Sequence, residues 1–328
     1  MKIKSDIQLF FIFLFIIIFV SKFLNSIFMK QLFIQLNTAV ILLLAFSFHC
    51  QGADKYTLEY KLEKGKTYKQ HSVSDMNMTM SAMGQDIKMN IQMDIDVKFD
   101  VIDQNNDGYN LRMSYQRIKT NMTSPAAYSI DSDSPENSSD KSSSDFLKSL
   151  IGVPIDIQIT QQGKVTSVKG VEKLMEKINS VDNPQFKQMF NQQFSEKMIQ
   201  KMIEQFSIYL PDKPVAINDN WDVATSLSSN GIDIINKMKL TLNQTANNVA
   251  TIGLTGTLST PEGGAVTKIQ GMDAKVSVTG TQTGTVQLDM KTGWLVRSEV
   301  NQKSTQNIEV MGQTMPQQVE VKVTTTAE

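Results

Sequence analysis

Three methionines at alternate positions, Met76, Met78 and Met80, are the residues whose type and spacing most directly suggest chemistry. Thioether sulfur is a soft ligand that suits Cu(I), so this run is a candidate copper-binding pattern. Methionine also fills irregular gaps in packed interiors, and alternate methionines are typical of one apolar face of a strand. A third hypothesis is that a concave sheet lined with flexible Met and Ile side chains holds an acyl chain or another apolar ligand. We favour packing over copper and predict no metal site and no cofactor.

A longer alternating pattern follows these methionines after a predicted turn at Met83-Gly84-Gln85. From Met89 to Val101, apolar residues alternate with polar ones, and successive side chains of a strand face opposite sides of its sheet. The pattern therefore predicts a long hairpin with one buried, methionine-rich face. If that face lines a cavity, the ligand-facing residues are Met76, Met78, Met80, Met89, Ile91, Met93 and Ile95.

Residues suited to catalysis are scarce in this sequence. It has two histidines, His49 and His71, and we interpret His71 as a surface residue because it lies on a polar strand segment. We find no nucleophile elbow, phosphate loop, dinucleotide fingerprint or metalloprotease motif. We therefore expect a protein that is not an enzyme and name no catalytic residue.

The segment Asp103 to Gly108 resembles the first half of a calcium-binding loop. The position that should supply the bidentate glutamate is Ser114, which lies in a predicted strand. Asn, Asp and Gly are also the residues that a hairpin turn requires. We therefore favour a plain hairpin turn over a calcium site.

Charge and cysteine content exclude several classes of function. The chain has 328 residues and a formal net charge of -1, and this balance gives no reason to expect a nucleic-acid partner. The single cysteine, Cys50, excludes an internal disulfide and a multi-cysteine metal site.

The N-terminal region contains two apolar runs. Residues 1–28 form an apolar segment, either a mis-called start before Met29 or a membrane anchor, and residues 29–52 have the pattern of a signal peptide. Lipidation of Cys50 and ordinary cleavage after Gly52 are both open, because Ser47-Phe48-His49 departs from a good lipobox. Each alternative exports the remaining chain to the periplasm or outer membrane, anchored by lipid at Cys50 or by the N-terminal apolar segment.

Residues 53–328 are predicted to form a single β-rich domain. The Ser-, Asp- and Pro-rich stretch 123–145 is expected to be a flexible loop, since it has few apolar residues to bury. Apolar spacing predicts helices over 170–210, and alternation predicts strands from there to the end, among them Trp221 to Leu227 and Val249 to Leu258. The expected fold is α+β and β-rich, with long antiparallel strands in a curved sheet or open barrel and a two-helix segment packed on one face.

Motifs in three parts of the body resemble a family of Bacteroidetes secreted proteins and lipoproteins, domain of unknown function 6263. The opening motif runs from Tyr56 to Tyr68, the middle one from Ile157 to Gly170, and the closing one joins Asp289–Trp294 to Met311-Gly312-Gln313. The resemblance implies an exported location and a lineage, without an activity. We therefore expect an envelope protein that is not an enzyme and binds a lipid or another apolar ligand. The alternatives are a structural or protein-interaction protein with a solid core, and a periplasmic Cu(I)-binding protein.

Overall fold

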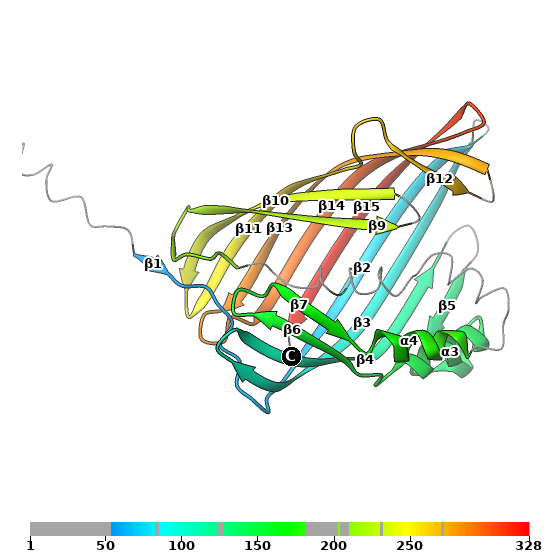
Figure 1. The fold of residues 1–328 in the computed structure, drawn as a ribbon. Helices are drawn as coiled ribbons and strands as arrows, with labels where there is room; N and C mark the ends of the chain where they lie inside the picture. The colour runs from blue at the N-terminus through cyan, green and yellow to red at the C-terminus, as the bar shows by residue number, and fades with distance from the viewer. Residues whose placement is uncertain are drawn as a thin grey trace, which may run out of the picture. The chain divides into compact units, whose positions relative to one another are not determined.

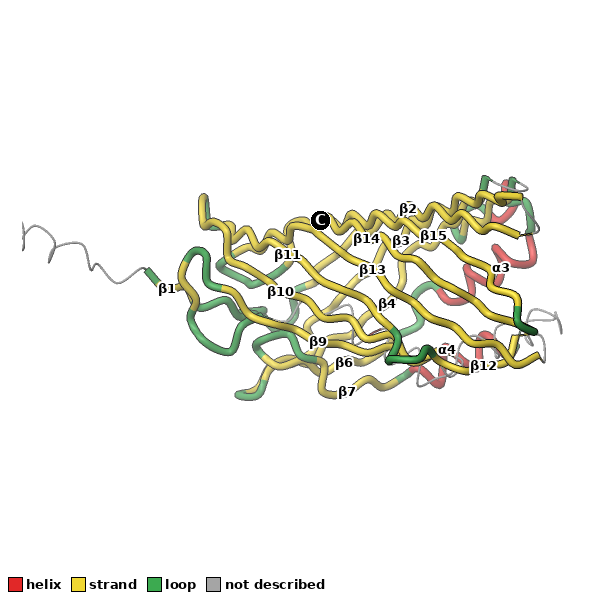
Figure 2. The backbone as a smooth tube through the Cα atoms, turned by 90° about the horizontal axis from the view of Figure 1, so that it is seen from above, coloured by secondary structure: helices red, strands yellow, loops and turns green. Residues whose placement is uncertain are grey.

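Thirteen antiparallel strands form one large curved sheet that does not close into a barrel (Figures 1 and 2). The computed structural model describes residues 54–82, 85–123, 127–180, 203, 210–229, 232–269 and 272–327. In chain order the strands of this sheet are β2 (Thr67–Ala82), β3 (Gln85–Asn105), β4 (Gly108–Met122), β5 (Tyr128–Asp131), β6 (Ile155–Thr160), β7 (Val165–Lys169), β9 (Asn220–Ser229), β10 (Ile232–Ala246), β11 (Val249–Ser259), β12 (Ala265–Ile269), β13 (Met272–Asp289), β14 (Leu295–Val310) and β15 (Gln313–Ala327).

The order across the sheet is β7-β6-β4-β3-β2-β15-β14-β13-β11-β10-β9, with β5 on β4 and β12 on β13. The last strand, β15, therefore pairs with the first long strand, β2, and joins the two halves of the chain. A separate two-stranded sheet pairs β1 (Lys55–Tyr56) with β8 (Val215–Ala216). The predicted curved sheet of long antiparallel strands is confirmed.

The predicted hairpin is formed by β2 and β3, which pair along their length from Thr67↔Asp100 to Ala82↔Gln85. The same register places Met76 opposite Ile91 and Met78 opposite Met89, so these apolar side chains share one face of the sheet. On that face the side chains of β3 become more buried toward the C-terminal end of the strand, where Val97, Phe99 and Val101 belong to the core.

The main core fills one end of the sheet's concave side. It combines this end of β3 with β4, β6, the segment 57–62 and strands of the C-terminal half. Two helices, α3 (Lys141–Leu150) and α4 (Val171–Asn179), contribute apolar side chains to the same core: Phe146, Leu150, Val171, Leu174 and Ile178.

The helical prediction for 170–210 is confirmed for its first part by α4. The second predicted helix lies outside the described residues, except that Ile203 is helical and buried. The predictions for residues 1–52, including the apolar segment, the signal peptide and Cys50, also lie outside the described residues. Among the helices that the structure describes, none combines the length and apolar character required to cross a membrane.

The predicted flexible loop over 123–145 is wrong for its described residues. It contains β5, the 3₁₀-helix η1 (Pro135–Asn137) and the start of α3. Polar side chains order it where apolar ones are few: the backbone N–H of Asp131 donates to the hydroxyl oxygens of Ser138 and Ser144, 3.0 and 3.1 Å away. Asp140 caps α3 by accepting a hydrogen bond from the Ser143 N–H.

Candidate functional site

A partly enclosed cavity of about 370 Å³ lies on the concave face of the sheet. Its wall takes side chains from eight strands, β2, β3, β9, β10, β11, β13, β14 and β15, and from Tyr60 in the segment before β2. Only the concave side of a curved sheet brings so many strands to one cavity. The lining residues are Tyr60, Gln70, Ser72, Ser74, Met93, Ile95, Val223, Met238, Leu240, Leu254, Val286, Leu295, Ser298, Val300, Val323 and Thr325.

Polar groups occupy one stripe of this wall. Ser72 on β2 is paired with Thr325 on β15, which is paired in turn with Ser298 on β14. The hydroxyl oxygens of Ser72 and Thr325 are 2.9 Å apart and share a hydrogen bond. Gln70 and Ser74 extend the stripe along β2, and most of the remaining wall is aliphatic. The cavity therefore offers neutral hydrogen-bonding groups on one side and an apolar surface on the other.

The seven predicted ligand-facing residues lie on the same face of the β2–β3 hairpin, but only two of them line the cavity. Met93 and Ile95 are in the wall, while Met76, Met78, Met80, Met89 and Ile91 lie closer to the hairpin turn and are half-buried. Sequence reasoning did not identify the wall residues from β9 to β15, because pairings between distant strands leave no local pattern. The Cu(I) hypothesis stays a prediction; the Met80 sulfur accepts a hydrogen bond from the Gln317 amide, 3.3 Å away.

An aromatic cluster borders the core end of the cavity. The Trp294 ring lies 6.0 Å from that of Tyr60, 4.6 Å from that of Tyr68 and 5.4 Å from that of Phe99, measured between centroids. Burial raises the pKa of Tyr60 to about 12. The indole nitrogen of Trp294 is buried without a hydrogen-bond partner among the described residues. Of these four rings, that of Tyr60 lines the cavity, and the other three pack behind it.

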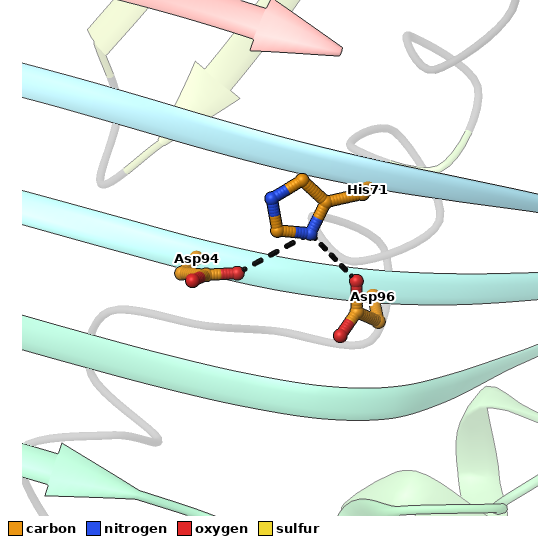
Figure 3. A group of neighbouring side chains, drawn as sticks. All are labelled: His71, Asp94 and Asp96. Atoms are coloured by element: carbon orange, nitrogen blue, oxygen red, sulfur yellow. Dashed lines mark hydrogen bonds and ion pairs between the residues drawn. The ribbon is translucent and has the colours of Figure 1, made fainter. Parts of the chain in front are cut away.

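A polar cluster lies on the opposite, convex face of the hairpin (Figure 3). His71 on β2 pairs with Asp96 on β3, and Asp94 is two residues away on the same face. The His71 Nδ1 is 2.7 Å from an Asp96 carboxylate oxygen and 3.5 Å from one of Asp94. The register that pairs Ala82 with Gln85 places His71 opposite Asp96. The predicted turn at Met83-Gly84-Gln85 indicated the hairpin but not this register.

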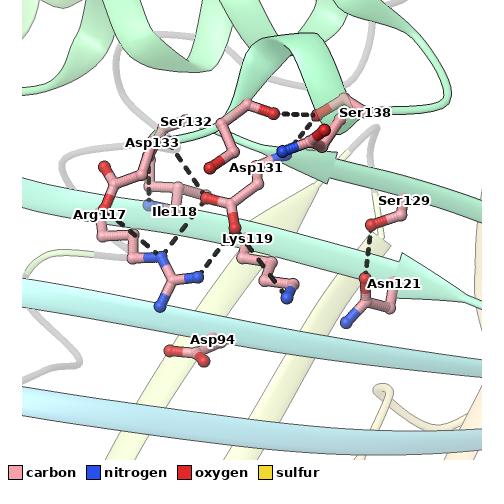
Figure 4. Close-up of polar contacts among 12 residues, drawn as sticks. Asp94, Arg117, Ile118, Lys119, Asn121, Ser129, Asp131, Ser132, Asp133 and Ser138 are labelled. Carbon is pink, nitrogen blue, oxygen red and sulfur yellow. Dashed lines mark hydrogen bonds and ion pairs between the residues drawn. The ribbon is translucent and has the colours of Figure 1, made fainter.

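Beside this cluster, Arg117 on β4 is held by carboxylates of the β5 region (Figure 4). Its guanidinium donates to both carboxylate oxygens of Asp131, at 2.8 and 3.3 Å, and lies 3.6 Å from Asp133. The hydrogen bond to Asp131 is the main reason that the pKa of Arg117 is raised, and it lowers the pKa of Asp131. Lys119 lies 3.9 Å from the same Asp131 carboxylate.

The half calcium loop is a tight turn between β3 and β4, as the hairpin interpretation predicts. The Asn105 side-chain oxygen accepts hydrogen bonds from the N–H groups of Asp107 and Gly108, at 2.9 and 3.1 Å. Asp103 is paired with Lys64 at 2.8 Å. The side-chain oxygens of Asn105 and Asp103 therefore stabilise the turn and form a salt bridge, respectively.

Comparison with known proteins identifies a matching family and several structures of distant similarity. Residues 106–295 match the model of a family of unknown function, DUF6263, and a search of curated proteins found no match. A lipovitellin structure concerned with lipid–protein interactions has a TM-score of 0.47 and 9% identity; the match covers 82% of this chain and 25% of that one.

Two bacterial structures are more distant. An outer membrane channel from Pseudomonas putida F1 has a TM-score of 0.21 and 7% identity, over 82% of this chain and 98% of that one. A domain from Vibrio parahaemolyticus, described as an outer membrane lipoprotein-sorting protein domain, has a TM-score of 0.14 and 8% identity, over 76% and 83%. At these scores the similarities carry no argument about function.

Proposed function

Because the chain belongs to DUF6263, a family of unknown function, we propose its role from the structure: a cell-envelope protein that is not an enzyme and binds a lipid or another apolar ligand on its concave face. The observation that carries the proposal is the cavity of about 370 Å³. Ligand pockets commonly measure about 300–1,000 Å³ and have mainly apolar walls with a few polar groups. The wall described above has this composition.

The size and polarity of the cavity define the class of ligand. A water molecule takes up about 30 Å³ in the liquid, so the cavity has room for about a dozen of them. A methylene group has a similar volume, which favours a single alkyl chain of about a dozen carbons. None of the described residues that line the cavity is charged. We therefore propose a neutral amphiphile, whose hydroxyl or carbonyl group bonds to the stripe formed by Ser72, Ser298 and Thr325.

The remaining parts of the proposal concern location and chemistry. A Bacteroidetes origin and an envelope location are supported by the motifs shared with that family and by the signal-like segment at residues 29–52. The proposed anchor is lipid at Cys50 or the N-terminal apolar segment, and mass spectrometry of the mature N-terminus distinguishes the two. The absence of enzymatic activity is supported by the position of His71, which faces away from the cavity.

A binding assay on the full chain, purified as the cell processes it and stripped of lipid, tests the proposal. We expect saturable, one-to-one binding of the fluorescent probe N-phenyl-1-naphthylamine and its displacement by 1-dodecanol. Val323→Lys places a charge in the wall, and Val323→Phe fills part of the cavity without a charge. Both should weaken probe binding at least about tenfold, since the loss of two buried methylene contacts alone costs about 1.6 kcal/mol.

Thr324→Lys is the matched control, because Thr324 is the neighbouring residue on the same strand and faces the convex side. It should bind the probe as the unmodified protein does. The proposal is overturned if the unmodified protein shows no saturable binding, or if the inner and outer variants bind equally. The first outcome favours the alternative of a structural or interaction protein with a solid core.

A further inference from the structure

The convex cluster of His71, Asp94 and Asp96 has the composition and spacing of a metal site. Each residue offers one ligand atom, and these three atoms lie within 4.8 Å of one another. Zinc binds histidine nitrogen at about 2.0–2.1 Å and carboxylate oxygen at about 2.0–2.2 Å, so tetrahedral ligands lie roughly 3.4 Å apart. The distances from His71 Nδ1 to the two carboxylates, 2.7 and 3.5 Å, bracket this separation. Small side-chain rotations would bring all three ligand atoms to one ion.

An unsatisfied oxygen in the cluster gives independent support. The Oδ1 atom of Asp94, which lies 3.5 Å from His71 Nδ1, is covered from solvent and accepts no hydrogen bond among the described residues, while the Asp94 side chain as a whole is 27% exposed. A polar atom that is covered from water without a partner destabilises the folded state, and more so when it carries charge. A bound cation would remove that destabilisation. The same ion would also offset the repulsion between Asp94 and Asp96, which project from the same face of β3.

The neighbouring cations are engaged elsewhere. The opposite charges of Arg117 and Asp94 attract each other, but the hydrogen bonds of Arg117 go to Asp131. Lys119 also lies beside Asp131, and Lys98 is paired with Asp100 at 2.9 Å. Arg117 and Lys119 are the cross-strand neighbours of Asp96 and Asp94 on β4, but among the described residues the ion pairs of these two carboxylates go to His71. Its side chain is about one-third exposed (33%), so an ion can reach the site from solvent.

We propose that His71, Asp94 and Asp96 bind a divalent transition metal of the Zn²⁺ class on the convex face, with water completing the coordination. One imidazole nitrogen with two carboxylate oxygens is a borderline ligand set that suits Zn²⁺, whereas Ca²⁺ and Mg²⁺ prefer oxygen alone. The site is independent of the proposed ligand cavity, because its residues face the other side of the sheet. It also departs from the sequence-based expectation that His71 is a plain surface residue and that no metal is bound.

Isothermal titration of the full chain, as the cell processes it and after treatment with EDTA, tests this proposal with ZnCl₂, CaCl₂ and MgCl₂ as separate titrants. We expect one Zn²⁺ per chain and at least about tenfold weaker binding of Ca²⁺ and Mg²⁺. Removing even an outer-shell partner of a metal ligand typically costs about 10–100-fold in affinity. His71→Asn, Asp94→Asn and Asp96→Asn should therefore each weaken Zn²⁺ binding by at least about tenfold.

Asp75→Asn is the matched control, since Asp75 lies on the same face of β2 and pairs with Gln92. It should leave the Zn²⁺ affinity unchanged. Thermal unfolding gives a second readout: Zn²⁺ should raise the midpoint of the unmodified protein and of Asp75→Asn, but not that of His71→Asn. The proposal is overturned if the unmodified protein binds no Zn²⁺, or if His71→Asn and Asp75→Asn bind it equally. Either result would leave an ordinary hydrogen bond between His71 and Asp96.

Discussion

Two leucines on β10 provide a direct test of whether the concave side contains a real cavity. Leu240 and Leu242 are two residues apart, share one face of the strand and are both buried, with 4% and 0% of their surfaces exposed. Leu240 lines the cavity and Leu242 does not. Truncating each to alanine removes the same atoms from the same strand, so the difference in stability reports what surrounds each side chain.

The expected costs follow from the surroundings. Leu→Ala removes three carbon groups, worth about 2.4 kcal/mol of transfer free energy. At Leu242 the atoms leave a new void of up to about 90 Å³, which adds about 2 kcal/mol at 24 cal/mol per Å³. At Leu240 the space joins a cavity that already exists, so this addition is largely absent. We expect Leu242→Ala to cost about 4 kcal/mol and Leu240→Ala about 2 kcal/mol.

Equilibrium unfolding in urea measures this difference. With a slope near 3 kcal/mol per molar urea, a gap of about 2 kcal/mol separates the two midpoints by roughly 0.7 M. Equal costs for Leu240→Ala and Leu242→Ala would show that Leu240 packs against a filled interior. That outcome would refute both the cavity and the proposed ligand.

Three further predictions concern the elements around the site. Gly293→Ala should destabilise the protein by more than about 2 kcal/mol in urea unfolding, because Gly293 has φ +70° and an added Cβ would lie 2.2 Å from the Glu59 carbonyl oxygen. Asp131→Asn should cost about 2 kcal/mol at pH 7, where the bond to Arg117 is intact. That bond lowers the pKa of Asp131. Its contribution to stability is therefore present above the ordinary aspartate pKa of 3.8 and is lost as the pH falls through the lower pKa of the folded state. The difference in stability between Asp131→Asn and the unmodified protein should therefore narrow in acid. Because burial raises the pKa of Tyr60 to about 12, stability should decline as the pH rises from 10 toward 12, by up to about 1.4 kcal/mol per pH unit.

Each of these predictions has a control. Gly263 also has a positive φ, +88°, with nothing within 4 Å of an added Cβ, so Gly263→Ala should cost only about 1–2 kcal/mol. A gap between Asp131→Asn and the unmodified protein that stays constant down to pH 2 would contradict the role given to the carboxylate charge. Tyr60→Phe should reduce the alkaline decline without abolishing it, because burial also raises the pKa of Tyr68 and of Tyr115. An unchanged decline would assign it to these other groups.

The strands were predictable because each carries a two-residue period. The expected strands Trp221 to Leu227 and Val249 to Leu258 correspond to β9 and β11 within two residues at each end. The hairpin of β2 and β3 was predicted for the same reason. A period of two identifies a strand and its faces, and a tight turn fixes the pairing of its two neighbours.

The cavity could not be predicted in the same way. Its wall joins Ser72 to Thr325, which are 253 positions apart and meet because β15 pairs with β2. No local pattern specifies which distant strands become neighbours. The ordered segment around β5 was missed for a different reason. The hydroxyl oxygens of Ser138 and Ser144 stabilise it by accepting hydrogen bonds from the backbone N–H of Asp131. Composition alone predicts a flexible loop from such residues.

The two proposed sites depend on one register, which links their tests. In the β2–β3 hairpin, His71 and Asp96 form one cross-strand pair, and Ser72 and Ile95 form the next pair on the opposite face. A shift of one residue in this pairing would exchange the faces of β2 relative to β3. Zn²⁺ binding that requires both His71 and Asp96 would therefore support the register that puts Ser72 and Ile95 in the cavity wall. It would leave the cavity's occupant undecided, because the ligand is recognised by side chains that the metal does not contact.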